Sequence, residues 1–287
     1  MDNSDSCSAK LKKVAYLGPR GTFSEETALG FYRGVDGQFF PYTSIDAVIR
    51  AVAAGEADEG IVPAENSLEG SVNVTLDTLA HEVDLFIVKE MVLPIRHNLL
   101  VRPGTKHVNS VLSHPQALAQ CRRYLSRHYP GAELVAVEST AAAAYRVASG
   151  AKDHAAVGSL RAAALYGLEA AAADIQDNAN NSTRFIVLGR KPAAAGKMPC
   201  KTSFVCQING EKPGSLCDIL VELARRDVNL TRIESRPART GLGEYIFFLD
   251  AEGSWRDENV HSAIEAVRRK SRWFKNLRSY PVYGAAP

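Results

Sequence analysis

The sequence is poor in the residues that build disulfide frameworks and metal centres. It has five cysteines, an odd number that never falls in CxxC spacing, and seven histidines that form neither HExxH nor HxH. Paired disulfides and a zinc site are therefore not expected. The cysteine pattern fits a protein of the reducing cytoplasm, and no metal ligands are predicted.

Long hydrophobic runs are missing too. No apolar stretch approaches the roughly 18 residues that a membrane-spanning helix needs. The first ten residues are polar and lack the apolar centre of a signal peptide. We therefore expect a cytoplasmic protein without a membrane partner.

Neither charge sign is in excess, since 34 Lys and Arg face 32 Asp and Glu and leave a formal charge of +2. A balance this close to neutral creates no broad field for nucleic acid, so none is expected as a partner. The chain also lacks a Walker A loop, a GxSxG elbow and a GxGxxG after a strand. These absences disfavour an enzyme that uses a nucleotide or a nicotinamide cofactor.

What is present is enough hydrophobic sequence for two folding units. The 287 residues, 46% of them hydrophobic, correspond to about two domains at roughly 150 residues each. In the first part of the chain, helices are predicted to begin at Thr22 and Ser44, between β-like runs. This βαβαβ pattern predicts a parallel or mixed α/β sheet. The strands are expected at 14–17, 38–43 and 59–62.

A second set of alternating elements follows. Helices are predicted to begin at Ser113, Thr140 and Ser159, and Ser113 has capping-box spacing to Gln116. Two α/β lobes that share one segment imply a cleft between them, where ligands usually bind. The expected fold is therefore a two-lobed α/β domain of the periplasmic-binding-protein type. The strands of this set are expected at 85–101, 133–137, 155–157 and 184–188.

The order of elements changes after residue 190. Residues 191–200 contain two prolines and several small residues without periodicity, which predicts a linker. Residues 201–283 then follow the ferredoxin-like order βαββαβ. We therefore predict a two-lobed domain at 13–190 and a smaller α/β domain at 201–283.

Polar residues gather where predicted strands give way to helices. Helix N-termini offer free N–H groups and a positive dipole end, so several of them around one cleft would suit a small anion. For any single junction, the alternative is that it serves only as a cap or turn. Arg184 could clamp a carboxylate bidentately or remain a surface residue. The junctions lie at 18–24, 63–72, 113–120, 138–140 and 180–185.

Several of these segments resemble, in the same order, the signature segments of the prephenate dehydratase family. They are Gly-Pro-Arg-Gly-Thr-Phe-Ser at 18–24, Glu-Asn-Ser at 65–67, Ser-His-Pro-Gln-Ala-Leu-Ala-Gln-Cys at 113–121 and Thr-Arg-Phe at 183–185. Pro-Gly-Ser-Leu at 213–216 and Glu-Ser-Arg-Pro at 234–237 resemble the two motifs of that family's ACT regulatory domain. Ser215 departs from the alanine that is common there. Only about a dozen residues precede the first strand, so we expect the monofunctional form, without a chorismate mutase domain.

The resemblance implies a carbon–oxygen lyase that converts prephenate to phenylpyruvate, with loss of carbon dioxide and water, in phenylalanine biosynthesis. Aromatisation drives the reaction, so no cofactor is implied. The family places proton donation at the threonine matching Thr183, a neutral hydroxyl that would donate or relay a proton. Glu65 would be the more conventional acid if it were buried, and His114 is a rival weakened by its place at a helix N-terminus. The implied catalytic residues are Thr183, Glu65, Asn66, Ser113 and Gln120, and the implied substrate-binding residues are Thr22, Ser67, Ser139, Thr140, Arg184 and Phe185.

The ACT resemblance implies feedback by L-phenylalanine, bound between two ACT domains. Feedback requires at least two states with different effector affinity, which predicts a homodimer or a homotetramer. The alternative is that Gly214 is only a turn glycine and Arg236 a surface residue. The implied effector-binding residues are Gly214, Ser215, Leu216, Glu234, Ser235 and Arg236.

Other functions stay open at this point. Arogenate could replace prephenate as the substrate, and the sequence does not decide between them. A two-lobed cleft is also how non-catalytic binding modules for small anions are built. A ligand-sensing regulator is a third possibility, although no helix-turn-helix segment is visible.

Overall fold

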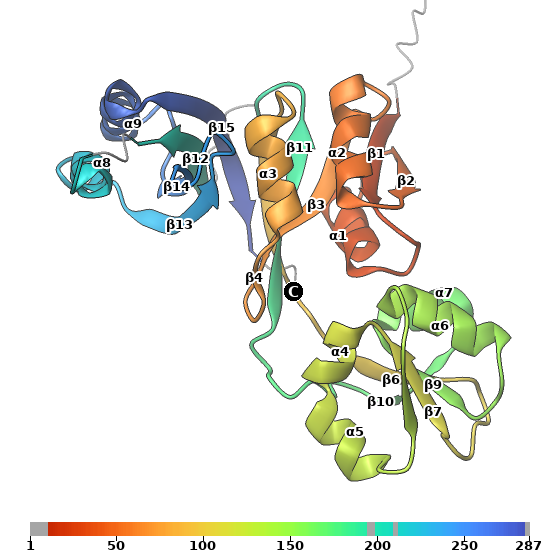
Figure 1. The fold of residues 1–287 in the computed structure, drawn as a ribbon. Helices are drawn as coiled ribbons and strands as arrows, with labels where there is room; N and C mark the ends of the chain where they lie inside the picture. The colour runs from red at the N-terminus through yellow and green to blue at the C-terminus, as the bar shows by residue number, and fades with distance from the viewer. Residues whose placement is uncertain (1–10, 194–198, 209–211, 285–287) are drawn as a thin grey trace, which may run out of the picture.

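A computed structural model describes residues 11–193, 199–208 and 212–284 (Figure 1). It contains two α/β lobes and a C-terminal α/β domain, so the predicted fold class is confirmed. The predicted linker at 191–200 includes residues 194–198, which lie outside the described residues.

The first lobe is formed by the N-terminal part of the chain and one returning strand. Its sheet has the order β5-β11-β3-β1-β2, with β1 parallel to both neighbours and β11 antiparallel to β3 and β5. The sheet is therefore mixed, and β2 carries Pro41 at its edge, where a missing N–H is tolerated. The elements are β1 (Lys12–Leu17), α1 (Phe23–Phe31), β2 (Gly37–Tyr42), α2 (Ile45–Ala54), β3 (Glu59–Asn66), β4 (Gly70–Ser71), α3 (Asn73–His81), β5 (Phe86–Pro94) and β11 (Ser182–Gly189).

The second lobe is inserted between β5 and β11 and lies below the first lobe in Figure 1. Its sheet has the order β10-β6-β9-β7-β8. The chain thus crosses between the lobes twice, which leaves a cleft at the crossing. The elements are β6 (Asn98–Val101), β7 (Ser110–Ser113), α4 (Pro115–Gln120), α5 (Arg122–His128), β8 (Glu133–Ala136), α6 (Thr140–Ser149), β9 (His154–Gly158), α7 (Leu160–Tyr166) and β10 (Glu169–Ala172).

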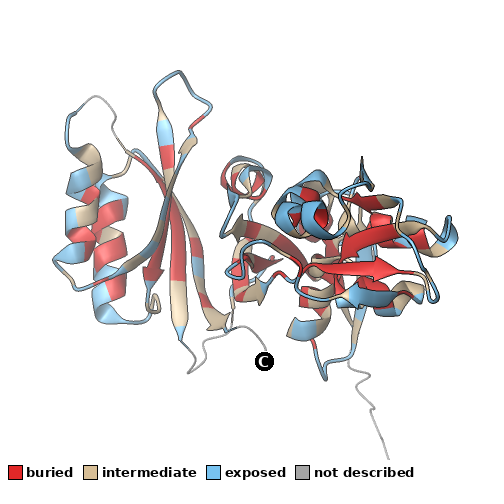
Figure 2. Ribbon diagram, turned by 90° about the horizontal axis from the view of Figure 1, so that it is seen from below, coloured by how far each residue is buried: buried red, intermediate tan, exposed pale blue. Residues whose placement is uncertain are grey.

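The C-terminal domain has the predicted βαββαβ order. Its sheet runs β13-β14-β12-β15, and the two helices pack on one face of it. Figure 2 shows these helices with one buried and one exposed side, as expected of amphipathic helices on a sheet. The elements are β12 (Cys200–Gln207), α8 (Ser215–Ala224), β13 (Leu230–Pro237), β14 (Tyr245–Glu252), α9 (Glu258–Lys270) and β15 (Trp273–Tyr283).

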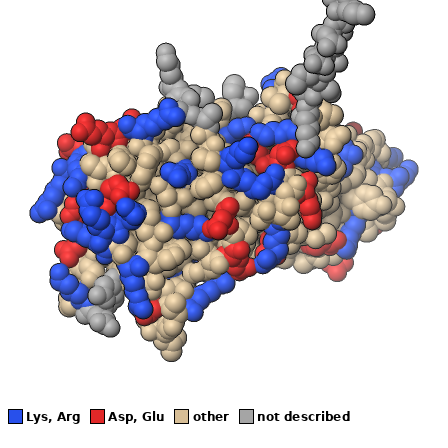
Figure 3. All heavy atoms as spheres, turned by 90° about the horizontal axis from the view of Figure 1, so that it is seen from above, with Lys and Arg blue, Asp and Glu red and all other residues tan. Residues whose placement is uncertain are grey.

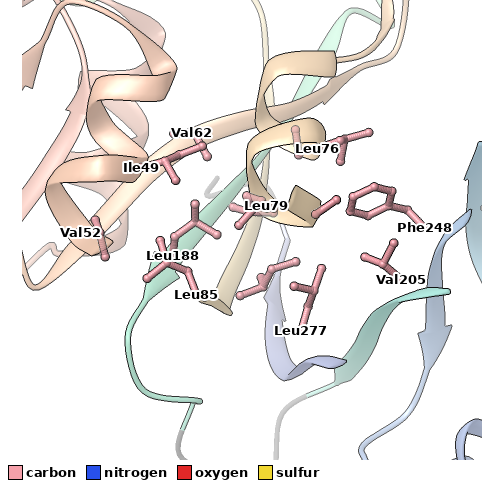
Figure 4. Close-up of a cluster of buried hydrophobic side chains, with 14 of the residues drawn as sticks. Ile49, Val52, Val62, Leu76, Leu79, Leu85, Leu188, Val205, Phe248 and Leu277 are labelled. Atoms are coloured by element: carbon pink, nitrogen blue, oxygen red, sulfur yellow. The ribbon is translucent and has the colours of Figure 1, made fainter. Parts of the chain in front are cut away.

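The sheets of the first lobe and the C-terminal domain are continuous. The end of β15 pairs with β5 in parallel, with Val282 opposite Glu90. Along β12, Phe204 packs toward α8 and α9, whereas Val205 packs into the core of the first lobe. Figure 4 shows Val205, Phe248 and Leu277 against Leu76 and Leu79 of α3. The sequence does not predict this shared core.

The helices begin where the sequence predicts them, with one exception. The hydroxyls of Thr22, Ser44, Ser139 and Ser159 each accept a hydrogen bond from the backbone N–H three residues later. The prediction that Ser113 caps a helix is wrong, because Ser113 ends β7 and His114 is the N-cap of α4. A proline at the first helical position makes the residue before it the cap.

The surface carries mixed charges. On the face seen in Figure 3, basic and acidic side chains are interspersed. Among the described residues, no helix is both long and apolar enough to cross a bilayer.

Candidate active site

A cleft of about 590 Å³ lies between the two lobes. All five polar junctions contribute to its wall, and Phe185 of the last junction is part of it. Among the described residues along this wall, none is Lys or Arg. The predicted site residues that line the cleft are Thr22, Asn66, His114, Gln120, Ser139, Thr140, Thr183 and Phe185.

Helix starts from both lobes face this cleft. Thr22 caps α1 in the first lobe and Ser139 caps α6 in the second lobe, and both line the wall. Each cap satisfies one backbone N–H, so further N–H groups of the first turn remain available. The positive dipole ends of these helices can hold an anion where cationic side chains are missing.

The side chain of Asn66 has a fixed orientation. Its Oδ1 accepts hydrogen bonds from the backbone N–H groups of Leu68 (2.9 Å) and Glu69 (3.1 Å). Its Nδ2 must therefore face the other way, and it donates to Thr183 Oγ1 at 2.9 Å and to Asn181 Oδ1 at 2.9 Å. The amide cannot flip without losing both backbone contacts.

This orientation decides what the Thr183 hydroxyl can do. Because Asn66 donates to its oxygen, Thr183 cannot give its own hydrogen to Asn66. No acceptor within the described part of the chain takes that hydrogen. Thr183 is only 8% exposed and lines the cleft, so its hydrogen is available to a group bound there.

The hydrogen-bond chain continues to Gln120 and His97. Asn181 Nδ2 donates to Gln120 Oε1 at 2.8 Å, and Gln120 Nε2 lies 3.3 Å from Glu69 Oε1. His97 Nε2 lies 2.9 Å from the same Gln120 oxygen. Asn66, Gln120 and Thr183, which the resemblance implies as catalytic, thus belong to one network. Asn181 and Glu69 lie within the predicted junctions 180–185 and 63–72 without being predicted as site residues, and His97 lies outside all five junctions.

Burial keeps His97 neutral. It lowers the pKa of the imidazole, and the hydrogen bond with Gln120 offsets this only in part. His97 is 3% exposed and lines the cleft. Its neighbours Arg96 and Asn98 are also polar, so no pattern in the sequence singles out His97.

Glu25 ties the two lobes together beside the cleft. Its carboxylate accepts from Arg161 Nε of α7 (3.1 Å) and from the backbone N–H of Gly21 (2.8 Å). Ser159 adds a second link by donating to the Gly21 carbonyl at 3.1 Å. Burial alone would raise the pKa of Glu25, but these donors outweigh it and lower the pKa, so the carboxylate stays charged.

Comparison with known proteins identifies the family. The prephenate dehydratase family model matches residues 14–193, and the ACT domain model matches residues 208–269. A prephenate dehydratase of Mycolicibacterium vanbaalenii is 43% identical over 96% of this chain and 93% of its own length. The chain belongs to the prephenate dehydratase family.

Two solved structures share the complete arrangement. The prephenate dehydratase of Arthrobacter aurescens, determined in complex with L-Phe, has a TM-score of 0.85 and 38% identity, covering 94% of this chain and 90% of its own. GqqA, described as a quorum-quenching acylase, has a TM-score of 0.83 and 30% identity, covering 96% of this chain and 99% of its own. Within the described residues, no three His, Cys, Asp or Glu side chains gather as metal ligands would.

Four implied site residues lie away from the dehydratase cleft wall. Ser113 is fully buried and donates to the Val157 carbonyl at 2.7 Å. Ser67 donates to the Asn180 carbonyl at 2.9 Å and so holds the loop before β11. Neither hydroxyl is placed to contact a substrate. The other two, Glu65 and Arg184, face the ACT domain.

Arg184 is part of a buried charge cluster, and its expected role as a carboxylate clamp does not fit this position. Its guanidinium lies 2.6 Å from Glu90, 2.7 Å from Asp250 and 3.0 Å from the Tyr280 hydroxyl. Burial by itself would lower the pKa of Arg184, but the Asp250 and Glu90 carboxylates raise it above its ordinary range. The side chain therefore joins the catalytic sheet to the ACT sheet.

Glu65 lies on the same side of the sheet as Arg184, toward the ACT domain. Its carboxylate lies 3.2 Å from Arg232 of β13 and 3.8 Å from Arg184. Paired with two guanidinium groups and outside the cleft wall, Glu65 does not fit the role of a proton donor. Arg232 also donates to Ser71 Oγ at 2.6 Å, and Ser71 does line the cleft.

The implied effector residues lie at one end of the ACT sheet. Ile246 of β14 is paired with Gln207, the last residue of β12, on one side and with Arg236 of β13 on the other side. Gly214 has φ = +84° before α8, a conformation that favours glycine, as a turn glycine would. Ser215 donates to the Lys212 carbonyl at 2.7 Å. The remaining residues are Leu216, which is half-buried, and Glu234 and Ser235 on β13.

Arg236 contacts the first lobe in this arrangement. It forms a bidentate ion pair with Asp77 of α3, with both N–O distances at 2.9 Å. The hydrogen bond from Arg236 lowers the pKa of Asp77 despite the opposing effect of burial. The second ACT motif is thereby attached to the catalytic domain.

Proposed function

We propose that this chain converts prephenate to phenylpyruvate, carbon dioxide and water, and that L-phenylalanine inhibits it through the ACT domain. The observation that supports this best is the Thr183 hydroxyl, whose oxygen accepts from Asn66 and whose hydrogen is left for a ligand in the cleft. Loss of the ring hydroxyl as water needs one proton, and in this proposal Thr183 delivers it.

In this reaction the carbon–carbon bond to the ring carboxylate breaks, and its electron pair moves into the ring. The carbon–oxygen bond to the ring hydroxyl breaks at the far side, and the departing oxygen takes one proton and leaves as water. Aromatisation makes the step favourable. Thr183 donates a hydrogen bond to that oxygen and relays the proton, which solvent replaces.

The two substrate carboxylates bind to helix ends rather than to cationic side chains. Thr22 and Ser139 with Thr140 mark two helix starts that line the cleft from opposite lobes. Two separate N-termini suit two carboxylates, because each dipole end favours one negative charge. Phe185 is 2% exposed and supplies an apolar wall for the ring.

Inhibition works through an assembly of ACT domains. β13 lies at the edge of the sheet, and Ile233 on it is 45% exposed, so a second copy can pair there. L-phenylalanine would bind between the two copies, near the start of α8. A homodimer, or a homotetramer of two dimers, is the expected assembly, and the cytoplasm remains the predicted location.

The test is an assay of the purified chain with prephenate and no added cofactor, following phenylpyruvate at several concentrations of L-phenylalanine. Turnover with inhibition supports the proposal. Faster turnover of arogenate would reassign the substrate. Activity confined to a quorum-quenching acylase assay would contradict it.

A further inference from the structure

His97 has one hydrogen-bonding atom that the network leaves unused. Asn66 fixes Asn181, and Asn181 donates to Gln120 Oε1, so this oxygen is an acceptor. His97 Nε2 must therefore carry the hydrogen that it shares with Gln120. In a neutral imidazole, Nδ1 then holds a lone pair and no hydrogen.

That lone pair has no donor within the described part of the chain. His97 Nδ1 is buried and unpartnered, although the residue lines the cleft. Its ring lies edge-on to Phe23, another residue of the cleft wall, at 5.8 Å. Buried acceptors are normally paired, so a ligand of this cleft is expected to bring a donor.

Resting on the proposed function, we propose that His97 Nδ1 accepts a hydrogen bond from the ring hydroxyl of the substrate. With both carboxylates ionised and a keto group on the side chain, prephenate has this hydroxyl as its single hydrogen-bond donor. Because the His97 Nδ1 lone pair has no other donor among the described residues, it favours binding of a ligand that carries this hydroxyl.

The contact would also orient the leaving group. When the hydroxyl gives its hydrogen to His97, its oxygen lone pairs are free to accept from Thr183. The oxygen then carries two hydrogens and leaves as water after one proton arrives from Thr183. His97 itself neither gains nor loses a proton, so its role is recognition of the hydroxyl.

Two substitutions separate this role from a purely structural one. His97→Gln places an amide N–H where Nε2 was and keeps the bond to Gln120, but it removes the Nδ1 acceptor. His97→Asn places an amide oxygen near Nδ1 and loses the bond to Gln120. We expect kcat/KM for prephenate to fall at least about tenfold in His97→Gln and to fall clearly less in His97→Asn.

Phenylpyruvate lacks the ring hydroxyl and serves as the matched control. Its inhibition constant should stay within about twofold of the wild-type value in both variants. The opposite order of activities, with His97→Asn impaired and His97→Gln normal, would assign His97 to holding Gln120 and overturn the proposal. Equal effects of the two variants would overturn it as well.

A measurement on the native histidine does not depend on how the variants fold. In the Thr183→Ala chain with ¹⁵N-labelled histidine, prephenate should shift the His97 Nδ1 resonance, and phenylpyruvate should leave it in place. An unchanged resonance with saturating prephenate would defeat the proposal. A wild-type chain without prephenate turnover defeats the proposed function first, so the two failures are distinguishable.

Discussion

Thr183 and Arg184 are consecutive residues of β11 that serve opposite faces of one sheet. Thr183 lines the cleft between the lobes, whereas Arg184 pairs with Glu90 and with Asp250 of the ACT domain. Successive side chains of a strand point to opposite faces, so the Thr183 hydroxyl in the cleft and the ACT contact of Arg184 are one residue apart. Any shift of the ACT sheet against β11 therefore acts next to the proposed proton donor.

Thr183→Ala should lower kcat at least about 100-fold, because the proton donor is lost. KM should change little, since the helix ends that hold the carboxylates remain. Thr183→Ser keeps the hydroxyl and is the control, with activity expected within about tenfold of wild type. Steady-state kinetics with prephenate test this, and a normal kcat in Thr183→Ala would refute the assignment.

Asn66→Asp should impair turnover about as strongly as Thr183→Ala does. The substitution keeps the shape but replaces the Nδ2 donor with a carboxylate oxygen, which would accept the Thr183 hydrogen and withdraw it from the substrate. An Asn66→Asp chain with wild-type kcat would show that the orientation of the Thr183 hydroxyl does not matter.

Arg184→Ala should reduce the free energy of unfolding by about 3–5 kcal/mol, because the Glu90 and Asp250 carboxylates would be left buried without this partner. Chemical denaturation measures this. Arg50→Ala, which removes exposed ion pairs with Asp46 and Glu82, is the control and should change the free energy of unfolding much less. Equal losses in the two variants would argue against a stabilising role for the Arg184 cluster.

Asp77→Asn should weaken inhibition by L-phenylalanine while basal turnover stays normal. It removes the charge that holds Arg236 of the second ACT motif on α3, and Asp77 lies outside the cleft wall. We expect the half-inhibitory concentration to rise about threefold to tenfold. Asp46→Asn changes an exposed ion pair elsewhere and should leave the inhibition curve unchanged.

Arg161→Met should raise KM for prephenate about threefold to tenfold with a smaller effect on kcat, because the ion pair with Glu25 links the lobes beside the cleft. Initial rates over a range of prephenate concentrations give both constants. An unchanged KM would mean that the remaining Ser159 contact is sufficient to hold the lobes together.

The sequence by itself determined much of the local structure. Thr22 and Ser44 cap their helices as predicted, because a cap depends on one side chain and the next three residues. The polar junctions likewise meet at the cleft: four lie at the ends of strands, and the junction at 180–185 begins β11, which runs antiparallel to β3 and so starts where β3 ends.

Only the tertiary structure decided on which face of the sheet each polar side chain of these motifs lies. Glu65 and Arg184 occur in the same motifs as Asn66 and Thr183, yet they turn toward the ACT domain. A strand buried on both faces gives no alternation of polar and apolar residues that would tell one face from the other. His97 joins the site only because Asn66, Asn181 and Gln120, distant in sequence, orient one another in the folded chain.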